Sequence, residues 1–152
     1  MRIVVLDTNI VFSCLLNSTG SIGDLLFNSD AVFAFYGNEH MRFEIRKHWE
    51  KLRKISGLSD SELEISYQKL LTRLNFLNEE LIPQKDWEKA ELLVSDTDPD
   101  DIPFVALTRH LKGTLWTGDK ALHSALKSKR FRWIYNTAEM LKLRDKITRQ
   151  GH

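Results

Sequence analysis

The chain has 152 residues, which is long enough for one domain with one hydrophobic core. Its formal net charge is +1, so the chain as a whole is neither strongly basic nor strongly acidic. Its 42% hydrophobic and 28% charged residues exclude an intrinsically disordered chain. Because Cys14 is the only cysteine and the apolar run at residues 3–6 is too short for a signal peptide or a membrane span, we expect a single cytoplasmic domain over residues 1–152.

Strand-like and helix-like segments alternate along the chain. The β-branched run at residues 2–6 predicts a buried strand, and the polar residues 7–9 suit the turn and helix cap that follow it. The rest of the first half is predicted to hold helices over residues 10–16 and 22–27, a strand over 31–36, and one long helix over 39–55 that ends at Gly57. Ser59 and Glu62 are predicted to open the next helix, which is followed by a strand ending at 81–83 and a helix over 84–95. The remaining segments are predicted to form a helix from 101 to 110, a strand over 114–117, a helix from 119 to 127 and a strand over 131–135. A last helix is capped by Asn136 and Glu139.

This alternation predicts an α/β fold with three layers, in which helices cover both faces of a mostly parallel sheet of four to five strands. In such sheets, ligands bind outside the carboxyl ends of the strands. Asp7 directly follows the first strand and Asp119 follows the strand at 114–117. Asp101 opens the helix that leads into that strand, and Glu44 lies one turn into the helix after the second strand.

Carboxylates that converge at one sheet edge repel each other unless cations lie among them. Mg²⁺ and Mn²⁺ prefer oxygen ligands from a few carboxylates, water and substrate phosphate. Such a site activates water and neutralises the charge that builds on a phosphodiester. Each residue alone is weak evidence, since an Asp at a helix start is usually a cap and a helical Glu is usually solvated. The joint pattern of Asp7, Glu44, Asp101 and Asp119 favours a metal site.

The sequence resembles a known family at four stretches, in the family's order and approximate spacing. These stretches are VLDTNIV at 5–11, EI at 44–45, DIPFVALT at 101–108 and LWTGD at 115–119. They resemble the PIN-domain family of metal-dependent nucleases, which includes the VapC-like ribonuclease toxins of many toxin–antitoxin pairs. The resemblance spans about residues 2–136, which is nearly the whole chain.

The resemblance implies an endoribonuclease that hydrolyses RNA phosphodiester bonds with Mg²⁺ or Mn²⁺. It makes Asp7, Glu44, Asp101 and Asp119 both the catalytic residues and the metal ligands, with Asn9 and Thr117 as supporting polar groups. It also implies an RNA substrate, a possible small antitoxin as partner, a possible homodimer and no membrane association.

The third carboxylate is ambiguous from sequence, because Asp98, Asp100 and Asp101 lie close together. We predict that Asp101 is the site residue because it directly precedes the apolar helix segment, and that Asp100 acts as a helix cap or dipole partner. Asp98 is predicted to be a turn residue before Pro99.

Two other functions were compared with nuclease activity. One is a catalytically inactive PIN-like module that binds RNA or protein, which purified protein would reveal by failing to cleave. The other is a phosphotransferase with an Asp nucleophile after the first strand, but that chemistry needs a second Asp where this chain has Asn9.

His40, Glu44 and His48 share one helix face, and at most one pair of them could bind a transition metal.

Charged residues are unevenly distributed along the chain. Residues 57–101 contain 4 Lys and Arg against 12 Asp and Glu, a net of −8, and residues 102–152 contain 11 against 3, a net of +8. Residues 41–54 contain 6 against 2, a net of +4. This pattern is consistent with metal gathered at one place and a polyanion at another, or with charged side chains that only solvate helix faces.

Overall fold

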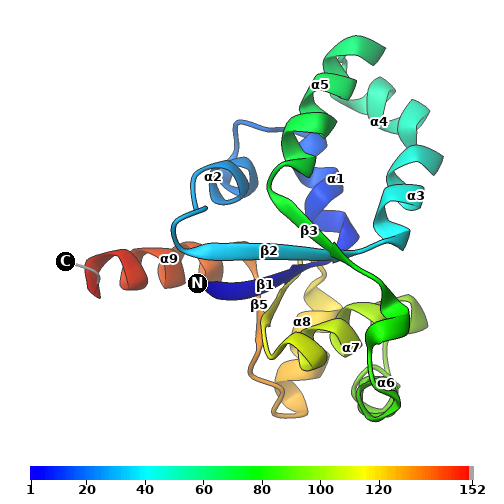
Figure 1. Cartoon of the computed structure of the whole chain (residues 1–152), viewed down its shortest axis with the longest axis vertical. Coiled ribbons are helices and arrows are strands. Elements are labelled where there is room, and N and C mark those ends of the chain that lie inside the picture. Colours follow the sequence, from blue (N-terminus) through cyan, green and yellow to red (C-terminus); the bar gives the residue numbers. More distant parts are fainter. Residues whose placement is uncertain (151–152) are drawn as a thin grey trace.

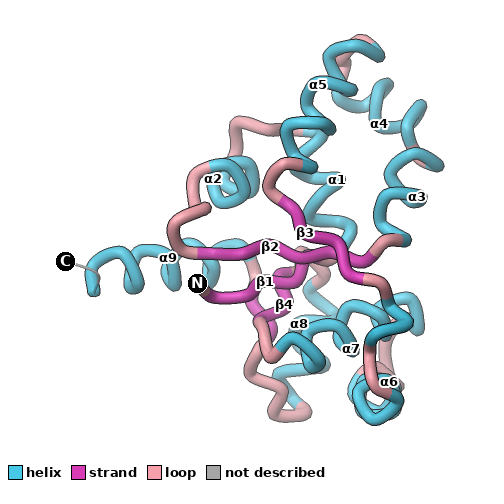
Figure 2. The backbone as a smooth tube through the Cα atoms, viewed as in Figure 1, coloured by secondary structure: helices cyan, strands magenta, loops and turns pink. Residues whose placement is uncertain are grey.

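The computed structural model describes residues 1–150, and its centre is a sheet of five parallel strands in the order β3-β2-β1-β4-β5 (Figures 1 and 2). The strands are β1 (Arg2–Leu6), β2 (Phe33–Asn38), β3 (Leu74–Leu77), β4 (Thr114–Trp116) and β5 (Ile134–Tyr135). The predicted α/β class with a parallel sheet is therefore confirmed, with five strands and every pairing parallel.

Helices cover both sides of this sheet, as Figure 1 shows. One side carries α1 (Thr8–Leu16), α2 (Ser21–Phe27), α3 (His40–Lys47), α4 (Trp49–Ser56) and α5 (Asp60–Leu71). The other side carries α6 (Gln84–Leu93), α7 (Ile102–Leu111) and α8 (Lys120–Ser128), and α9 (Thr137–Gln150) follows β5 and packs against α2. Short 3₁₀ turns, η1 (Glu79–Leu81) and η2 (Pro99–Asp101), precede α6 and α7.

The core is built around the central strand β1. Val4, Val5 and Leu6 have no exposed surface, because a parallel strand with helices on both faces buries successive side chains on either side. On the neighbouring strand, Trp116 is also fully buried. Cys14 lies in the same core, where burial raises the pKa of its thiol to about 11, so it behaves as a small apolar side chain.

The predicted long helix over 39–55 is wrong, because it is broken at His48 into α3 and α4. The apolar stripe continues across the break, but α4 turns to pack against α1. The indole N–H of Trp49 donates to Asp60 at the start of α5 over 2.7 Å. Tertiary contacts therefore override the continuous helical pattern. Gly57 ends α4 in the left-handed region as expected (φ 73°).

The predicted strand ending at 81–83 is also wrong. The third strand is β3, where Leu74 pairs with Phe35 of β2, and the later segment forms the 3₁₀ turn η1. Leu74 continues the apolar stripe of α5, so the sequence pattern alone did not separate the end of this helix from the strand. The second strand begins and ends two residues later than predicted, because the carbonyl of Ser29 accepts the first N–H groups of the segment in a turn.

Several other boundaries match the sequence expectations within a few residues. The capping box of Ser59 and Glu62 opens α5 with both reciprocal hydrogen bonds, and Asn136 and Glu139 exchange the same pair of bonds at the start of α9. Across residues 1–150, no single helix is long and apolar enough to span a membrane, although α1 and α2 together reach that length and composition around a bend of 107°.

Candidate active site

Asp7 lies at the carboxyl end of β1 and caps α1. Its backbone N–H donates to the carbonyl of Trp116 over 3.1 Å, which continues the pairing of β1 with β4. Its side chain is 6% exposed and accepts hydrogen bonds from the hydroxyl of Thr117 (2.8 Å) and the backbone N–H of Asn9 (3.4 Å). Burial raises the pKa of this carboxyl even though these bonds act in the opposite direction.

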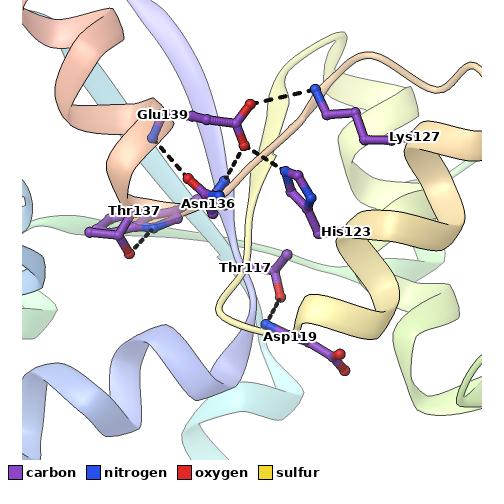
Figure 3. Close-up of polar contacts among 8 residues, drawn as sticks. Thr117, Asp119, His123, Lys127, Asn136, Thr137 and Glu139 are labelled. Carbon is purple, nitrogen blue, oxygen red and sulfur yellow. Dashed lines mark hydrogen bonds and ion pairs between the residues drawn. The ribbon is translucent and has the colours of Figure 1, made fainter.

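Asn9 and Thr117 link the first and last sequence motifs. The side-chain amide of Asn9 donates to Asp7 over 3.3 Å and accepts the backbone N–H of Gly118, also over 3.3 Å. The hydroxyl of Thr117 donates to Asp7 and accepts the backbone N–H of Asp119 over 3.0 Å (Figure 3). Both residues therefore hold Asp7 and the segment that leads to Asp119 in one arrangement.

Asp119 caps α8 and is partly buried. One carboxylate oxygen accepts the backbone N–H groups of Ala121 and Leu122 over 2.9 and 3.1 Å. Figure 3 shows this carboxylate pointing away from the nearby polar cluster, in which Glu139 contacts His123 and Lys127. Asp119 therefore combines a structural role with a position beside Asp7.

The carboxylate of Asp101 is buried, and no hydrogen bond compensates for its loss of contact with water. It is 8% exposed, and its Oδ2 atom has no hydrogen-bond partner among residues 1–150. Burial, followed by the charges of Asp7 and Asp119, raises its pKa from 3.8 to about 7. These three carboxylates, drawn from distant parts of the chain, therefore lie close enough to act on one another.

Asp100 is exposed, whereas Asp101 points into the protein. The expectation that Asp100 acts as the cap is corrected, because Asp98 accepts the backbone N–H of Asp100 over 2.9 Å and caps the 3₁₀ turn η2. This turn sets which of the two adjacent carboxylates is buried.

Glu44 lies on α3, and its carboxylate contacts both neighbouring histidines of that helix face. The distances are 3.0 Å to Nε2 of His40 and 3.6 Å to Nε2 of His48. Glu44 lines a cavity of about 560 Å³ together with Asp7, Asp100 and Asp101. Three of the four predicted carboxylates, Asp7, Glu44 and Asp101, therefore line one cavity. Asp119 does not line it, but its negative charge raises the pKa of Asp101.

The sequence pattern of the PIN domain matches residues 5–141. The chain belongs to the PIN-domain family. PIN domains are typically nucleases, and divalent metal is their general cofactor. No curated protein matches the chain in sequence.

Among solved structures, this PIN domain is similar to a chain of VapBC2 from Rickettsia felis bound to a DNA fragment from their promoter. The TM-score is 0.63 at 16% sequence identity, and the match covers 88% of this chain and 98% of that one. At this identity the likeness shows the shared fold.

The carboxylates that line the cavity of this PIN domain suit a divalent cation that prefers oxygen ligands, such as Mg²⁺ or Mn²⁺. Among residues 1–150, no three His, Cys, Asp or Glu side chains stand close enough to hold an ion together. Mg²⁺, however, binds through one or two carboxylates and completes its shell with water and substrate phosphate. Asp7 and Asp101 line the same cavity, and the Oδ2 atom of Asp101 has no hydrogen-bond partner among residues 1–150, so these two residues are the candidates to hold such an ion.

Sequence reasoning missed two polar residues that line the cavity of this PIN domain, Asn38 and Glu79. Asn38 ends β2 beside β1, and its side-chain oxygen accepts the backbone N–H of Met41 over 3.0 Å at the start of α3. The rule that sites lie at the carboxyl ends of parallel strands would have found Asn38 if the strand end had been placed correctly. Glu79 lies in the 3₁₀ turn after β3, a turn that the sequence pattern did not predict.

Proposed function

We propose that this PIN domain is a metal-dependent endoribonuclease that hydrolyses RNA phosphodiester bonds, with Asp7, Glu44, Asp101 and Asp119 as the acidic residues of its site. The observation that carries the proposal is the buried, unpartnered carboxylate oxygen of Asp101, whose pKa is raised by its burial and by the charges of Asp7 and Asp119. A purely structural carboxylate would be satisfied by hydrogen bonds or by a cation of the protein.

The acidic and polar residues of the site have different proposed roles. Asp7 and Asp101 would hold Mg²⁺ or Mn²⁺, and the bound ion would supply positive charge to the scissile phosphate and lower the pKa of the attacking water. Thr117 and Asn9 orient Asp7 through hydrogen bonds to its Oδ2 atom, whereas its Oδ1 atom accepts the backbone N–H of Asn9 over 3.4 Å. Glu44 and Asp119 add negative charge at the rim, which raises the affinity of the cavity for a cation.

The first test is metal dependence. Purified protein should cleave single-stranded RNA in Mg²⁺ or Mn²⁺ and lose that activity in excess EDTA, because the proposed ligands are carboxylate oxygens and the ion is needed to bring a phosphate close to them. Gel analysis of a labelled RNA gives the rates. Undiminished cleavage in chelator contradicts the metal mechanism, and absence of cleavage with either ion favours the inactive binding module.

A second test uses the adjacent pair Asp100 and Asp101, which have the same chemistry and differ in burial. Asp101→Asn should abolish metal-dependent cleavage, because it removes the charge of the buried ligand. Asp100→Asn is the matched control and should retain most of the activity, because Asp100 is exposed and contributes only its backbone N–H to the bond with the Asp98 carboxylate. A dead Asp100→Asn beside an active Asp101→Asn would reverse the assignment of the third carboxylate.

We further propose that this domain spans the whole chain and is the toxin of a toxin–antitoxin pair in the cytoplasm, with a small antitoxin as partner and a homodimer as a possible assembly. The support is the likeness to a chain of the VapBC2 complex together with the PIN-domain family assignment. Co-expression with the product of the neighbouring gene, followed by size-exclusion chromatography, tests both partner proposals. A protein that stays monomeric and unbound, and whose expression alone leaves cell growth unchanged, contradicts them.

A further inference from the structure

A second cavity, of about 480 Å³, lies away from the carboxylate site. It lies between α6, α7 and the segment that precedes β5, and we call it the amino-edge cavity because Gly113 comes directly before β4 and Trp133 comes directly before β5. Asp7 and Asp119 instead follow the carboxyl ends of β1 and β4. The two cavities share no lining residue.

The amino-edge cavity is strongly basic. Its lining includes four cations and a single carboxylate, Asp86, in a chain whose net charge is +1. The cations are Lys85, Lys89, Arg109 and Lys112. Asp86 is 6% exposed and lies 3.5 Å from Nε of Arg109, an ion pair without a hydrogen bond, so it offsets the charge of that guanidinium. Among residues 1–150, the pair of Asp86 with Arg109 is the one ion pair formed by a cation of this cavity. The three lysines of the cavity are therefore available for an anion.

The cavity also contains an exposed aromatic ring that packs against a buried one. Trp133 is 57% exposed, although large aromatic rings usually bury most of their surface. Phe131 beneath it is buried and contacts it edge to face, with 5.7 Å between ring centroids. An indole anchored at its edge and open to solvent is the kind of surface on which a nucleic-acid base stacks.

One of these cations occupies a position that normally favours glycine. α7 ends in a Schellman motif, in which the N–H of Gly113 donates to the carbonyl of Thr108 over 3.0 Å and Lys112 takes the left-handed conformation (φ 54°). Arg130 does the same at the end of α8 (φ 65°), but it does not line the cavity. Lys112 therefore places a charged side chain at the cavity, although its left-handed backbone conformation favours glycine.

We propose that the amino-edge cavity binds a nucleoside phosphate, with its base against Trp133 and its phosphate among Lys85, Lys89 and Lys112. The volume lies within the range of small-ligand sites, about 300–1,000 Å³, and the exposed indole favours a base over an acidic protein segment, which would use the lysines alone. The nucleoside phosphate is either a free nucleotide or one unit of an RNA strand. The inference goes beyond the proposed nuclease activity and stands without it, because no residue is shared with the carboxylate site.

The test follows the indole N–H resonance of Trp133, assigned by comparison with Trp133→Phe, while AMP, UMP, adenosine or a short single-stranded RNA is added. All titrations are done in EDTA, so that metal-dependent cleavage plays no part and failure of the nuclease proposal leaves the result unaffected. We expect AMP or UMP to shift this resonance in a saturable manner that weakens as salt is added, and adenosine to bind more weakly because it lacks the phosphate.

Lys112→Gly and Arg130→Gly form a matched pair, since each removes one positive charge and places glycine at a left-handed position. Both variants should fold with melting temperatures at or above that of the wild type. Lys112→Gly should weaken nucleotide binding about tenfold, as expected for loss of one charge-assisted contact, and Arg130→Gly should leave it nearly unchanged.

Several outcomes overturn the proposal. They are equal weakening in both glycine variants, adenosine binding as tightly as AMP, no shift of the Trp133 resonance at millimolar nucleotide, or preferential binding of polyglutamate. Tighter binding of the RNA strand than of AMP supports the proposal with the strand as the source, and binding of AMP without the strand supports it with a free nucleotide.

Discussion

Replacing Asp7 by Asn should lower the rate of metal-dependent RNA cleavage by about 10²- to 10⁴-fold, because a metal ion contributes several kcal/mol to transition-state stabilisation and each ~1.4 kcal/mol corresponds to a factor of ten. The substitution is nearly isosteric. The amide oxygen of Asn takes the place of the carboxylate oxygen that accepts from Thr117 and Asn9, so those two contacts are retained. Single-turnover cleavage of a labelled RNA measures the effect.

The control for Asp7→Asn is folding. Asp7 also caps α1, through its other oxygen Oδ1, which accepts the backbone N–H of Asn9 and is replaced by the amide NH₂ in this variant. Losing this cap costs about 1 kcal/mol, and removing one of several repelling carboxylates offsets that cost in EDTA, so circular dichroism should match that of the wild type and the melting temperature should change little. An unfolded variant would mean that Asp7 is needed mainly as a structural cap. A folded variant with full activity would remove Asp7 from the proposed metal site.

The metal-free protein should lose stability progressively as the pH rises from about 4 to about 7, and Asp101→Asn should remove most of this loss. The folded state raises the pKa of Asp101 from 3.8 to about 7, so it binds this proton more tightly than the unfolded state does. The stabilisation is therefore fully present below pH 3.8 and is lost as pH rises through the folded pKa. At about 1.4 kcal/mol per pKa unit, the difference between the two proteins changes by at most ~4 kcal/mol from pH 4 to pH 8.

Urea unfolding in EDTA at a series of pH values measures this difference. Adding Mg²⁺ at pH 8 should then raise the stability of the wild type more than that of Asp101→Asn, since the ion binds the ionised site of the folded state. Parallel pH profiles for the two proteins, with no selective response to Mg²⁺, would show that Asp101 neither titrates with a raised pKa nor contributes to a cation site.

The positions at the ends of the central strands were predictable from sequence. Asp7 and Asp119 each follow a short apolar run, and parallel strands bring such positions to one edge of the sheet. The hydrogen bonds of Thr117 to both residues agree with its expected supporting position. The catalytic roles of these residues stay predictions.

Other features depend on contacts that a one-dimensional pattern does not contain. The choice between Asp100 and Asp101 follows from the short 3₁₀ turn capped by Asp98, and the break at His48 follows from the packing of α4 against α1. The amino-edge cavity draws Lys85 and Lys89 from a segment that is acidic on average, so the charge count along the chain gave no sign of it.

The order of the strands has a consequence for how the protein is made. β1 pairs with β4, and the bond from Thr117 to Asp7 joins residues 110 positions apart. A ribosome that has synthesised β1, β2 and β3 has therefore produced neither Thr117 nor Asp119, and the nascent chain holds an incomplete set of carboxylates. Closing so long a loop is a late and slow step in folding. The chain would thus leave the ribosome before its cavity is assembled. Under the proposed function, this order gives an antitoxin translated alongside it time to engage the chain before the nuclease site is complete.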